Sequence, residues 1–293
     1  MKRLIVTADD FGAAPQVNDA VEVAHRSGVL SAASLMVGAP QAADAVARAR
    51  HMPSLRVGLH LVLVAGRPLL AASAVSRLVD ASGAFRSNMV ALGAIIAVSA
   101  RARRQLAAEI SAQFEAFGAT GLTLDHCNAH KHFHLHPMVG RLLLEIGSRF
   151  GLRAVRVPLE PAQVLRAIEP GSAPAPAALT AAYARLLRRR SRAAGLLAPD
   201  QVFGLRWSGR MTQQRLCALI RSLPPGLSEI YLHPATGPFT GAAPDYLYRA
   251  EFEALRAPEV IAACREGSLR LGGFGDFLAA GMAPPWSASR STA

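Results

Sequence analysis

The sequence is poor in cysteine, which accounts for only three of its 293 residues. Cys127, Cys217 and Cys264 are odd in number and widely spaced, and no two of them form a CxxC pair. This argues against a disulfide framework and against a cysteine-based zinc module. Few, isolated cysteines are typical of a reducing compartment, so we expect a cytoplasmic location.

Long hydrophobic runs are also lacking. The longest, Met89–Ala100, falls well short of the about 20 residues that span a bilayer. The apolar run that begins at Leu4 ends at two aspartates, and it is shorter than the about 7–15 residues of a signal-peptide core. We therefore expect a buried β-strand there rather than a leader, and no membrane span.

Acidic and aromatic residues are scarce beside the basic ones. Lys plus Arg number 32 against 20 Asp plus Glu, a formal net charge of +12, and aromatics make up 6% of the chain. A basic surface attracts nucleic acid, anionic lipid or anionic substrates. Single-stranded nucleic acid also needs aromatic side chains on which bases stack, and the arginine run at 188–190 contains none. We expect no nucleic-acid partner.

Short apolar segments alternate with helical ones along the chain. The expected strands cover residues 2–8, 30–37, 55–63, 122–127, 154–157, 229–232 and 269–271, and the expected helices cover 18–27, 42–50, 103–117 and 137–150. This alternation is typical of a parallel α/β sheet or barrel. The 51% of hydrophobic residues can fill the core of one barrel of this length.

The alternation is interrupted twice. Residues 82–104 carry an apolar run followed by RARR, and residues 160–200 are rich in Pro and Ala before ARLLRRRSRAAG. We interpret both as insertions over the mouth of a single barrel domain that covers residues 1–280. Residues 281–293 are expected to form a flexible tail.

Two adjacent aspartates, Asp9 and Asp10, follow the first expected strand. Carboxylates at the carboxyl end of a parallel strand lie where such folds place their active sites. Adjacent side chains of a strand point to opposite faces, so the pair converges only if the chain turns, which Gly12 permits. The alternative is that Asp10 caps the following helix.

Two histidines end later strands. His60 lies in GLHL and His233 lies in YLHPA. Taken alone, each is explained equally well as a histidine of the core or of a turn. Whether they belong to a functional site depends on which residues lie beside them in the fold.

A third segment, residues 125–137, holds five of the nine histidines of the chain. They are His126, His130, His132, His134 and His136. If the segment is extended, the last four share one face. Neutral imidazole is the commonest metal ligand and the usual acid or base near pH 7. The segment therefore predicts a site, whereas Cys127 within it is expected to fill strand core.

These motifs fit one constellation, because each falls where a strand should end on the same face of a barrel. One Asp and two His give three ligands and leave an open position, which is typical of a catalytic metal centre. A second Asp and a further His remain for proton transfer.

The chain resembles the YdjC-like carbohydrate deacetylase family through TADDFG, GLHL, NAHKHFHLHP and YLHPA, in that order. It is most similar to the branch associated with hopanoid biosynthesis (HpnK), through KRLIVTADDFG, AASLMVGAP, LDHCNAHKHFHLHP, VFGLRWSG and EIYLHPAT. The resemblance implies an irregular TIM-like (β/α) barrel of the polysaccharide deacetylase and glycoside hydrolase type.

The resemblance also implies roles for single residues. It implies one divalent metal ion, zinc or magnesium, held by Asp10, His60 and His130, with Asp9 as general base and His233 assisting the leaving amine. The residues that it suggests for substrate binding are Arg156, His132, His134 and Asn128.

The chain departs from the chitooligosaccharide members of that family at two positions. Asn128 stands where they have Asp, and Lys131 stands where they have a third His. Neither position is a metal ligand. The differences weaken the inference that this chain shares the soluble oligosaccharide substrate of those members.

The implied reaction is removal of the acetyl group from an N-acetylglucosaminyl hopanoid. The alternatives are a soluble chitooligosaccharide as substrate, or a non-catalytic protein that binds metal or sugar and acts in regulation. A homodimer is also expected. Acetate release separates the enzyme readings from the binding reading, and the choice of substrate separates the first two.

Two stretches combine apolar and basic residues in a way that suits anionic membrane. They are Leu92, Ile95, Ile96 and Val98 before Arg101, Arg103 and Arg104, and Leu186 and Leu187 before Arg188, Arg189 and Arg190. They predict peripheral contact with the inner face of the membrane. The alternative is a core helix followed by a solvated helix face.

Overall fold

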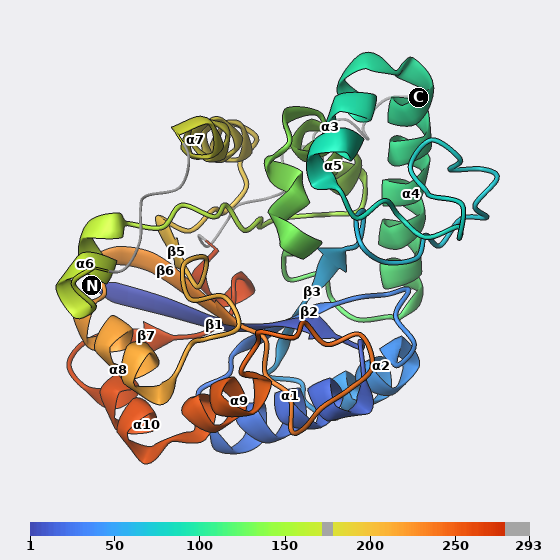
Figure 1. The fold of residues 1–293 in the computed structure, drawn as a ribbon. Helices are drawn as coiled ribbons and strands as arrows, with labels where there is room; N and C mark the ends of the chain where they lie inside the picture. Colours follow the sequence, from blue (N-terminus) through green and yellow to red (C-terminus); the bar gives the residue numbers. More distant parts are fainter. Residues whose placement is uncertain (172–177, 279–293) are drawn as a thin grey trace, which may run out of the picture.

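The protein is built around a parallel seven-stranded sheet that curls into a half-barrel and is wrapped by helices (Figure 1). The structure, a computed structural model, describes residues 1–171 and 178–278. The strands are β1 Lys2–Phe11, β2 Ala32–Leu35, β3 Arg56–Leu61, β4 Cys127–Ala129, β5 Gln201–Phe203, β6 Gly226–Leu232 and β7 Leu269–Leu271. Their order is β4-β3-β2-β1-β6-β5, with β7 paired to β1. The predicted α/β fold is confirmed.

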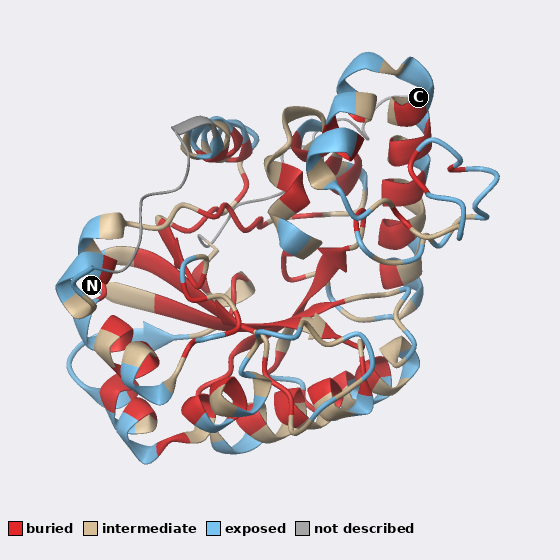
Figure 2. Ribbon diagram, in the orientation of Figure 1, coloured by how far each residue is buried: buried red, intermediate tan, exposed pale blue. Residues whose placement is uncertain are grey.

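β1 is the central strand. Along one edge it pairs with β6 from Lys2 to Ala8. It also pairs with β7 through Lys2 to Leu4 and with β2 from Thr7 onward. Residues Leu4 to Ala8 are completely or almost completely buried, as expected for a parallel strand covered on both faces, and Figure 2 shows the sheet at the buried centre of the molecule.

The helices lie around this sheet. They are α1 Pro15–Ser27, α2 Ala42–Arg50, α3 Met89–Val98, α4 Ala100–Ala119, α5 Pro137–Arg149, α6 Ala162–Ile168, α7 Ala178–Ala193, α8 Gln213–Ser222, α9 Tyr248–Arg256 and α10 Pro258–Arg265, with 3-10 turns η1 His130–Leu135 and η2 Gly275–Phe277. α1 shows why the pattern works: Val17, Ala20, Val21 and Ala24 form one buried stripe, because residues three and four apart share a helix face.

Two predicted strands are largely wrong. Of residues 122–127 only Cys127 enters a strand. Asp125 precedes it and accepts the backbone N–H groups of Phe274 and Gly275 with its carboxylate, at 3.2 and 2.7 Å. Residues 154–157 make only isolated bridges, one of them between Val155 and Cys127. β5, in contrast, was not predicted.

The expected insertions contain regular structure. Residues 82–104 include α3 and the start of α4. Further along α4, Glu109 accepts the backbone N–H groups of Leu69 and Leu70, at 2.9 and 3.1 Å, and so holds the loop after β3. Residues 160–200 include α6 and α7. The single-domain assignment stays a prediction, and the tail expected at 281–293 lies outside the described residues.

One close contact between strands makes a test of this packing. A Cβ added at Gly58 in β3 would lie 2.5 Å from the ring and from the carbonyl oxygen of His126. Overpacking of this kind costs about 1–3 kcal/mol, so Gly58→Ala should lower the urea midpoint of unfolding. Gly118→Ala in α4 is the control, since its Cβ would meet nothing within 4 Å and alanine favours a helix. Equal midpoints for the two variants would contradict the packing argument.

Candidate metal centre

Asp10, His60 and His130 meet at the carboxyl ends of β1, β3 and β4. Asp10 Oδ1 lies 3.3 Å from His60 Nε2 and 3.2 Å from His130 Nδ1, and the two ring nitrogens are 3.4 Å apart. The three form a group of possible metal ligands. The constellation predicted from the sequence is therefore brought together in space.

Asp10 reaches this position because β1 bulges there. Ala8 pairs with Ala33 of β2, but Phe11 rather than Asp10 pairs with Leu35, so β1 contains one extra residue. Asp10 adopts a left-handed backbone with φ 62°. A bulge re-aims side chains next to active sites. The turn predicted at Gly12, which has φ 96°, thus already begins at Asp10.

The three donor atoms fit a divalent cation. Tetrahedral ligands at about 2.1 Å from an ion lie about 3.4 Å from one another, and the observed separations run from 3.2 to 3.4 Å. One carboxylate and two imidazoles suit zinc and several other divalent ions. Three protein ligands leave coordination open for a substrate or water.

A chain of hydrogen bonds fixes which nitrogen of His60 is free for the ion. His60 Nδ1 donates to Asn128 Oδ1 at 2.6 Å, which leaves the lone pair on Nε2. Asn128 Nδ2 donates to Ser34 Oγ, Ser34 in turn to His126 Nε2, and His126 Nδ1 to Asp125, at 2.9, 3.0 and 3.0 Å. The Asp125 carboxylate accepts only, so it sets the direction of every bond in the chain.

Asp9 lies beside the ligands but is held by other partners. Arg156 donates to both of its oxygens, at 2.6 and 3.0 Å, and Asn128 Nδ2 lies 3.2 Å from Oδ1. Burial alone would raise the pKa of Asp9, but Arg156 and His60 outweigh it and hold the pKa well below its usual range. Asp9 is therefore an ionised carboxylate with a fixed orientation.

Arg156 also binds a second carboxylate. Its Nε and NH2 groups contact Glu229 Oε1 at 2.8 and 2.7 Å, and Thr7 Oγ1 donates to the same oxygen at 2.9 Å. The guanidinium also lies over the ring of Tyr231, 4.5 Å from its centroid. Because a buried charge is tolerated only when paired and hydrogen-bonded, the network must form as a unit.

The histidine-rich segment is not extended, so its imidazoles do not share one face. It forms η1, in which Lys131 and His132 adopt left-handed backbones with φ 53° and 54°. His132 Nε2 contacts Tyr231 Oη at 2.8 Å, and His134 Nε2 donates to the Arg156 carbonyl at 2.9 Å. Burial lowers the pKa of His134 to about 4, so its ring is neutral.

Three residues suggested for substrate binding lie beneath the site. Arg156, His134 and Asn128 have no exposed surface, and each is engaged by the contacts above. In the structure Asn128 contacts Asp9 and His60, Arg156 contacts Asp9, and His134 contacts the Arg156 backbone. Their role in substrate binding stays a prediction. Only His132, of the four suggested, is partly exposed.

His233 follows β6 and completes the site. Its ring packs edge-on against Tyr231 and Tyr246, with centroids 5.7 and 5.0 Å away. Burial lowers its pKa, while the charges of Asp10 and Asp9 oppose that shift without cancelling it. The neutral imidazole is thus its resting form.

Several residues around the candidate metal ligands were not predicted from the sequence. Ser34, Glu229, Tyr231 and Tyr246 were not singled out. The sequence held a signal for two of them: Ser34 is the polar residue of the strand AASL, and Glu229 is the charged residue of the strand GLSEIYL. Both side chains are completely buried.

The contact between Asn128 and His60 predicts an effect on metal affinity. Removing a partner that orients a metal-binding histidine typically weakens binding about 10–100-fold, so Asn128→Ala should raise the Kd for zinc by that factor in chelator competition. Asn88→Ala, which removes the side-chain cap of α3, is the control for general loss of stability. Unchanged zinc affinity in Asn128→Ala would refute the orienting role.

Comparison with known proteins places the chain in a family. A carbohydrate deacetylase of Brevibacillus brevis is 39% identical over 148 residues, 50% of this chain and 56% of that protein, and one of Geobacillus stearothermophilus is 38% identical over 162 residues, 55% and 60%. The chain thus spans less than two thirds of the length of these curated relatives.

The fold is similar to a crystal structure from Enterococcus faecalis V583, provisionally named a cellobiose-phosphate cleavage protein. The TM-score is 0.76 at 22% identity, and the match covers 95% of this chain and 99% of that one. The model of the family described as YdjC-like protein matches residues 3–266. The chain belongs to the YdjC-like protein family.

Proposed function

We propose that this protein is a metal-dependent carbohydrate N-deacetylase. The observation that carries the proposal is the Asp10, His60 and His130 group with a separate, ionised carboxylate, Asp9, beside it. A binding protein needs the three ligands but has no use for a spare base. The names of the relatives, carbohydrate deacetylase, support the same activity.

The roles follow from the positions of the residues. A divalent cation held by the three ligands would supply Lewis acidity to the acetamide carbonyl and to a water. Asp9, kept ionised and fixed by Arg156, accepts the proton of the attacking water. His233 is neutral at rest, so it must first take up the proton that Asp9 received from the water. It then donates that proton to the amine nitrogen as the C–N bond breaks, which returns Asp9 and His233 to their resting forms. The products are acetate and a free amino sugar.

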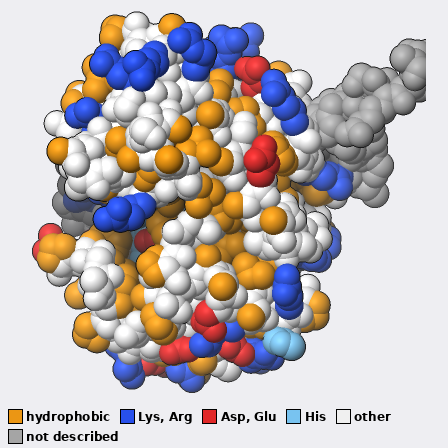
Figure 3. Space-filling view, turned by 90° about the vertical axis from the view of Figure 1, so that its right-hand side faces the viewer, with side chains coloured by type: hydrophobic (Ala, Val, Ile, Leu, Met, Phe, Trp, Pro, Cys, Tyr) orange, Lys and Arg blue, Asp and Glu red, His pale blue; other side chains and the backbone are white. Residues whose placement is uncertain are grey.

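We further propose a lipid-linked substrate, an N-acetylglucosaminyl hopanoid, and contact with anionic membrane. α3 supports the membrane contact, but with other residues than those predicted. Leu92 and Ile96 of the predicted apolar patch are buried, whereas Val90 and Val98 are each 84% exposed. Eight residues apart, they lie on one face of the helix. Figure 3 shows Lys and Arg gathered at the upper edge of this side of the molecule, beside hydrophobic side chains.

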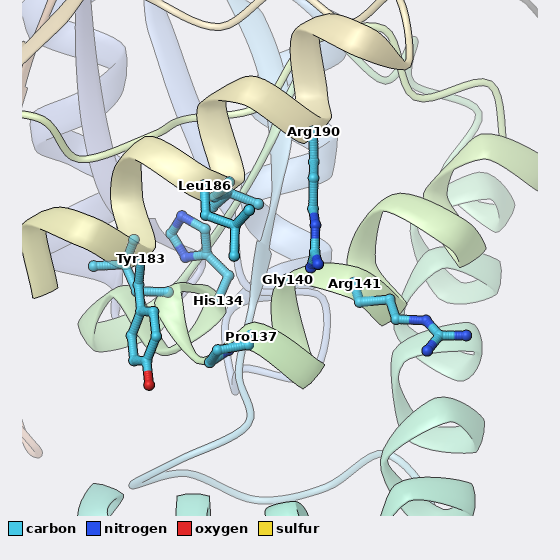
Figure 4. Close-up of a pocket in the computed structure, with 9 residues that line it drawn as sticks. His134, Pro137, Gly140, Arg141, Tyr183, Leu186 and Arg190 are labelled. Atoms are coloured by element: carbon cyan, nitrogen blue, oxygen red, sulfur yellow. The ribbon is translucent and has the colours of Figure 1, made fainter. Parts of the chain in front are cut away.

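α7 adds a second apolar and basic surface. Leu187 is buried, while Leu186 is 37% exposed. Both line a small open groove between α7 and the turn into α5 (Figure 4). Tyr183, Arg141 and Arg190 are also part of its lining.

Among the helices of residues 1–171 and 178–278, none combines the length and the apolar composition that a bilayer span requires.

Acetate release tests the proposed reaction. The zinc-loaded or magnesium-loaded protein should release acetate from the N-acetylglucosaminyl hopanoid in preference to chitobiose. Asp9→Asn should lower kcat about 100- to 10,000-fold, the usual contribution of a general base, while the metal content by elemental analysis stays at the wild-type level. A preference for chitobiose would refute the lipid-linked substrate in favour of a soluble one. Substrate binding without acetate release would refute the proposed deacetylase activity.

Flotation with anionic liposomes tests the membrane contact. Replacing Val90 and Val98 together by Asp adds charge to the apolar face of α3 and should lower the vesicle-bound fraction several-fold. Leu247→Asp, at a residue 49% exposed outside α3 and α7, is the matched control. Equal flotation of both variants and the wild type would exclude α3 as the contact.

A further inference from the structure

A buried carboxylate on α9, Glu251, accepts hydrogen bonds from the backbone of two segments, one of which carries His233. Glu251 has no exposed surface. Its Oε1 accepts the backbone N–H of Met211 at 2.8 Å, and its Oε2 accepts the backbone N–H of His233 in a short hydrogen bond. Across the described parts of the chain, no Lys, Arg or His forms an ion pair with it.

This arrangement is costly for the fold. Burial raises the pKa of Glu251 to about 8, although the two backbone hydrogen bonds oppose the shift. A buried carboxyl without a cationic partner destabilises the fold, and more so when it is ionised than when it is neutral. An apolar side chain would pack here without that cost, so the two acceptor oxygens are the feature that needs explanation.

The hydrogen bond from the His233 backbone to Glu251 affects the position of the His233 ring. Among residues 1–171 and 178–278, no group forms a hydrogen bond with its buried Nδ1. Functional histidines are usually oriented by such a partner. Here the ring is left to its packing between Tyr231 and Tyr246 and to the position of its own backbone, which Glu251 holds.

The hydrogen bond from the Met211 backbone to Glu251 affects the support of Tyr246, whose ring also packs against His233. Met211 belongs to the loop that carries Ser208 and Gly209. Ser208 Oγ lies 2.8 Å from Tyr246 Oη, and the Tyr246 ring packs so closely on Gly209 that a Cβ there would lie 2.1 Å from it. Gly209 also accepts the backbone N–H of Leu247 at 2.6 Å. Fixing Met211 therefore fixes the support of Tyr246.

We propose that Glu251 is a positioning residue that sets the orientation of the His233 imidazole from both sides, through the backbone of His233 and through the loop beneath Tyr246. The inference rests on the proposed function, in which His233 delivers a proton to the leaving amine. It assigns to α9 a part in catalysis although none of its residues reaches the metal ligands.

Glu251→Gln tests this role with little change in shape. A glutamine has one acceptor oxygen, so one of the two backbone N–H groups would face another N–H donor. Misplacing a catalytic group by about 1 Å can cost about 100-fold. We expect kcat to fall by about that factor while KM and the Kd for zinc stay within about twofold. Glu251→Asp keeps both oxygens on a shorter side chain and should show a smaller loss in the same direction.

Asp200→Asn is the matched control. Asp200 also accepts a backbone N–H of the segment that forms β6, that of Leu227 at 2.9 Å, but it does so at the opposite end of the strand. The control should lose stability without a fall in kcat. In a His233→Ala background, Glu251→Gln should cause no further loss of kcat, because the two residues act through the same step.

The His233 ring resonances in a ¹H–¹⁵N NMR spectrum give a readout that does not depend on activity. They should shift or broaden in Glu251→Gln and remain in place in Asp200→Asn. Unchanged resonances, wild-type kcat in Glu251→Gln, or an equal loss in the His233→Ala background would overturn the proposal. Absence of acetate release by the wild type would refute the proposed function, and the NMR comparison would then decide the positioning of His233 by itself.

Discussion

The site depends on one buried guanidinium. Arg156 forms ion pairs with both Asp9 and Glu229 from a position without solvent contact. Two carboxylates on neighbouring strands would repel each other in a core of low dielectric. Only a planar, always charged fork with several donors can bind both in fixed directions. Without Arg156, Asp9 would be either protonated or displaced.

With Arg156 in place, two successive aspartates serve different purposes. The bulge of β1 turns Asp10 toward His60 and His130, while Asp9 stays within the strand and points to Arg156. Adjacent residues of a regular strand could not both face the same ion and its surroundings. A single extra residue therefore directs Asp10 to His60 and His130 and leaves Asp9 with Arg156. The division is made by the backbone, since the two side chains are identical.

Much of this could be predicted from short-range patterns. The helix at 42–50 follows from periodicity, and the gathering of the Asp and His motifs follows from the ends of parallel strands. The choice of Asp10, His60 and His130 among them came from the family resemblance. The conformation of the histidine-rich segment did not follow, because the left-handed residues Lys131 and His132 have no local signal. The burial of Arg156 was missed for a related reason, since its partner Glu229 lies far away in sequence and only the closed sheet joins them.

The pairing of β1 has a consequence for synthesis of the chain. β1 is synthesised well before β6 and β7, the strands that pair with it from Lys2 to Ala8 and from Lys2 to Leu4. Contacts so distant in sequence form slowly, and an unpaired apolar strand is prone to association while it waits. The nascent polypeptide must therefore keep this strand shielded until β6 and β7 have both been synthesised.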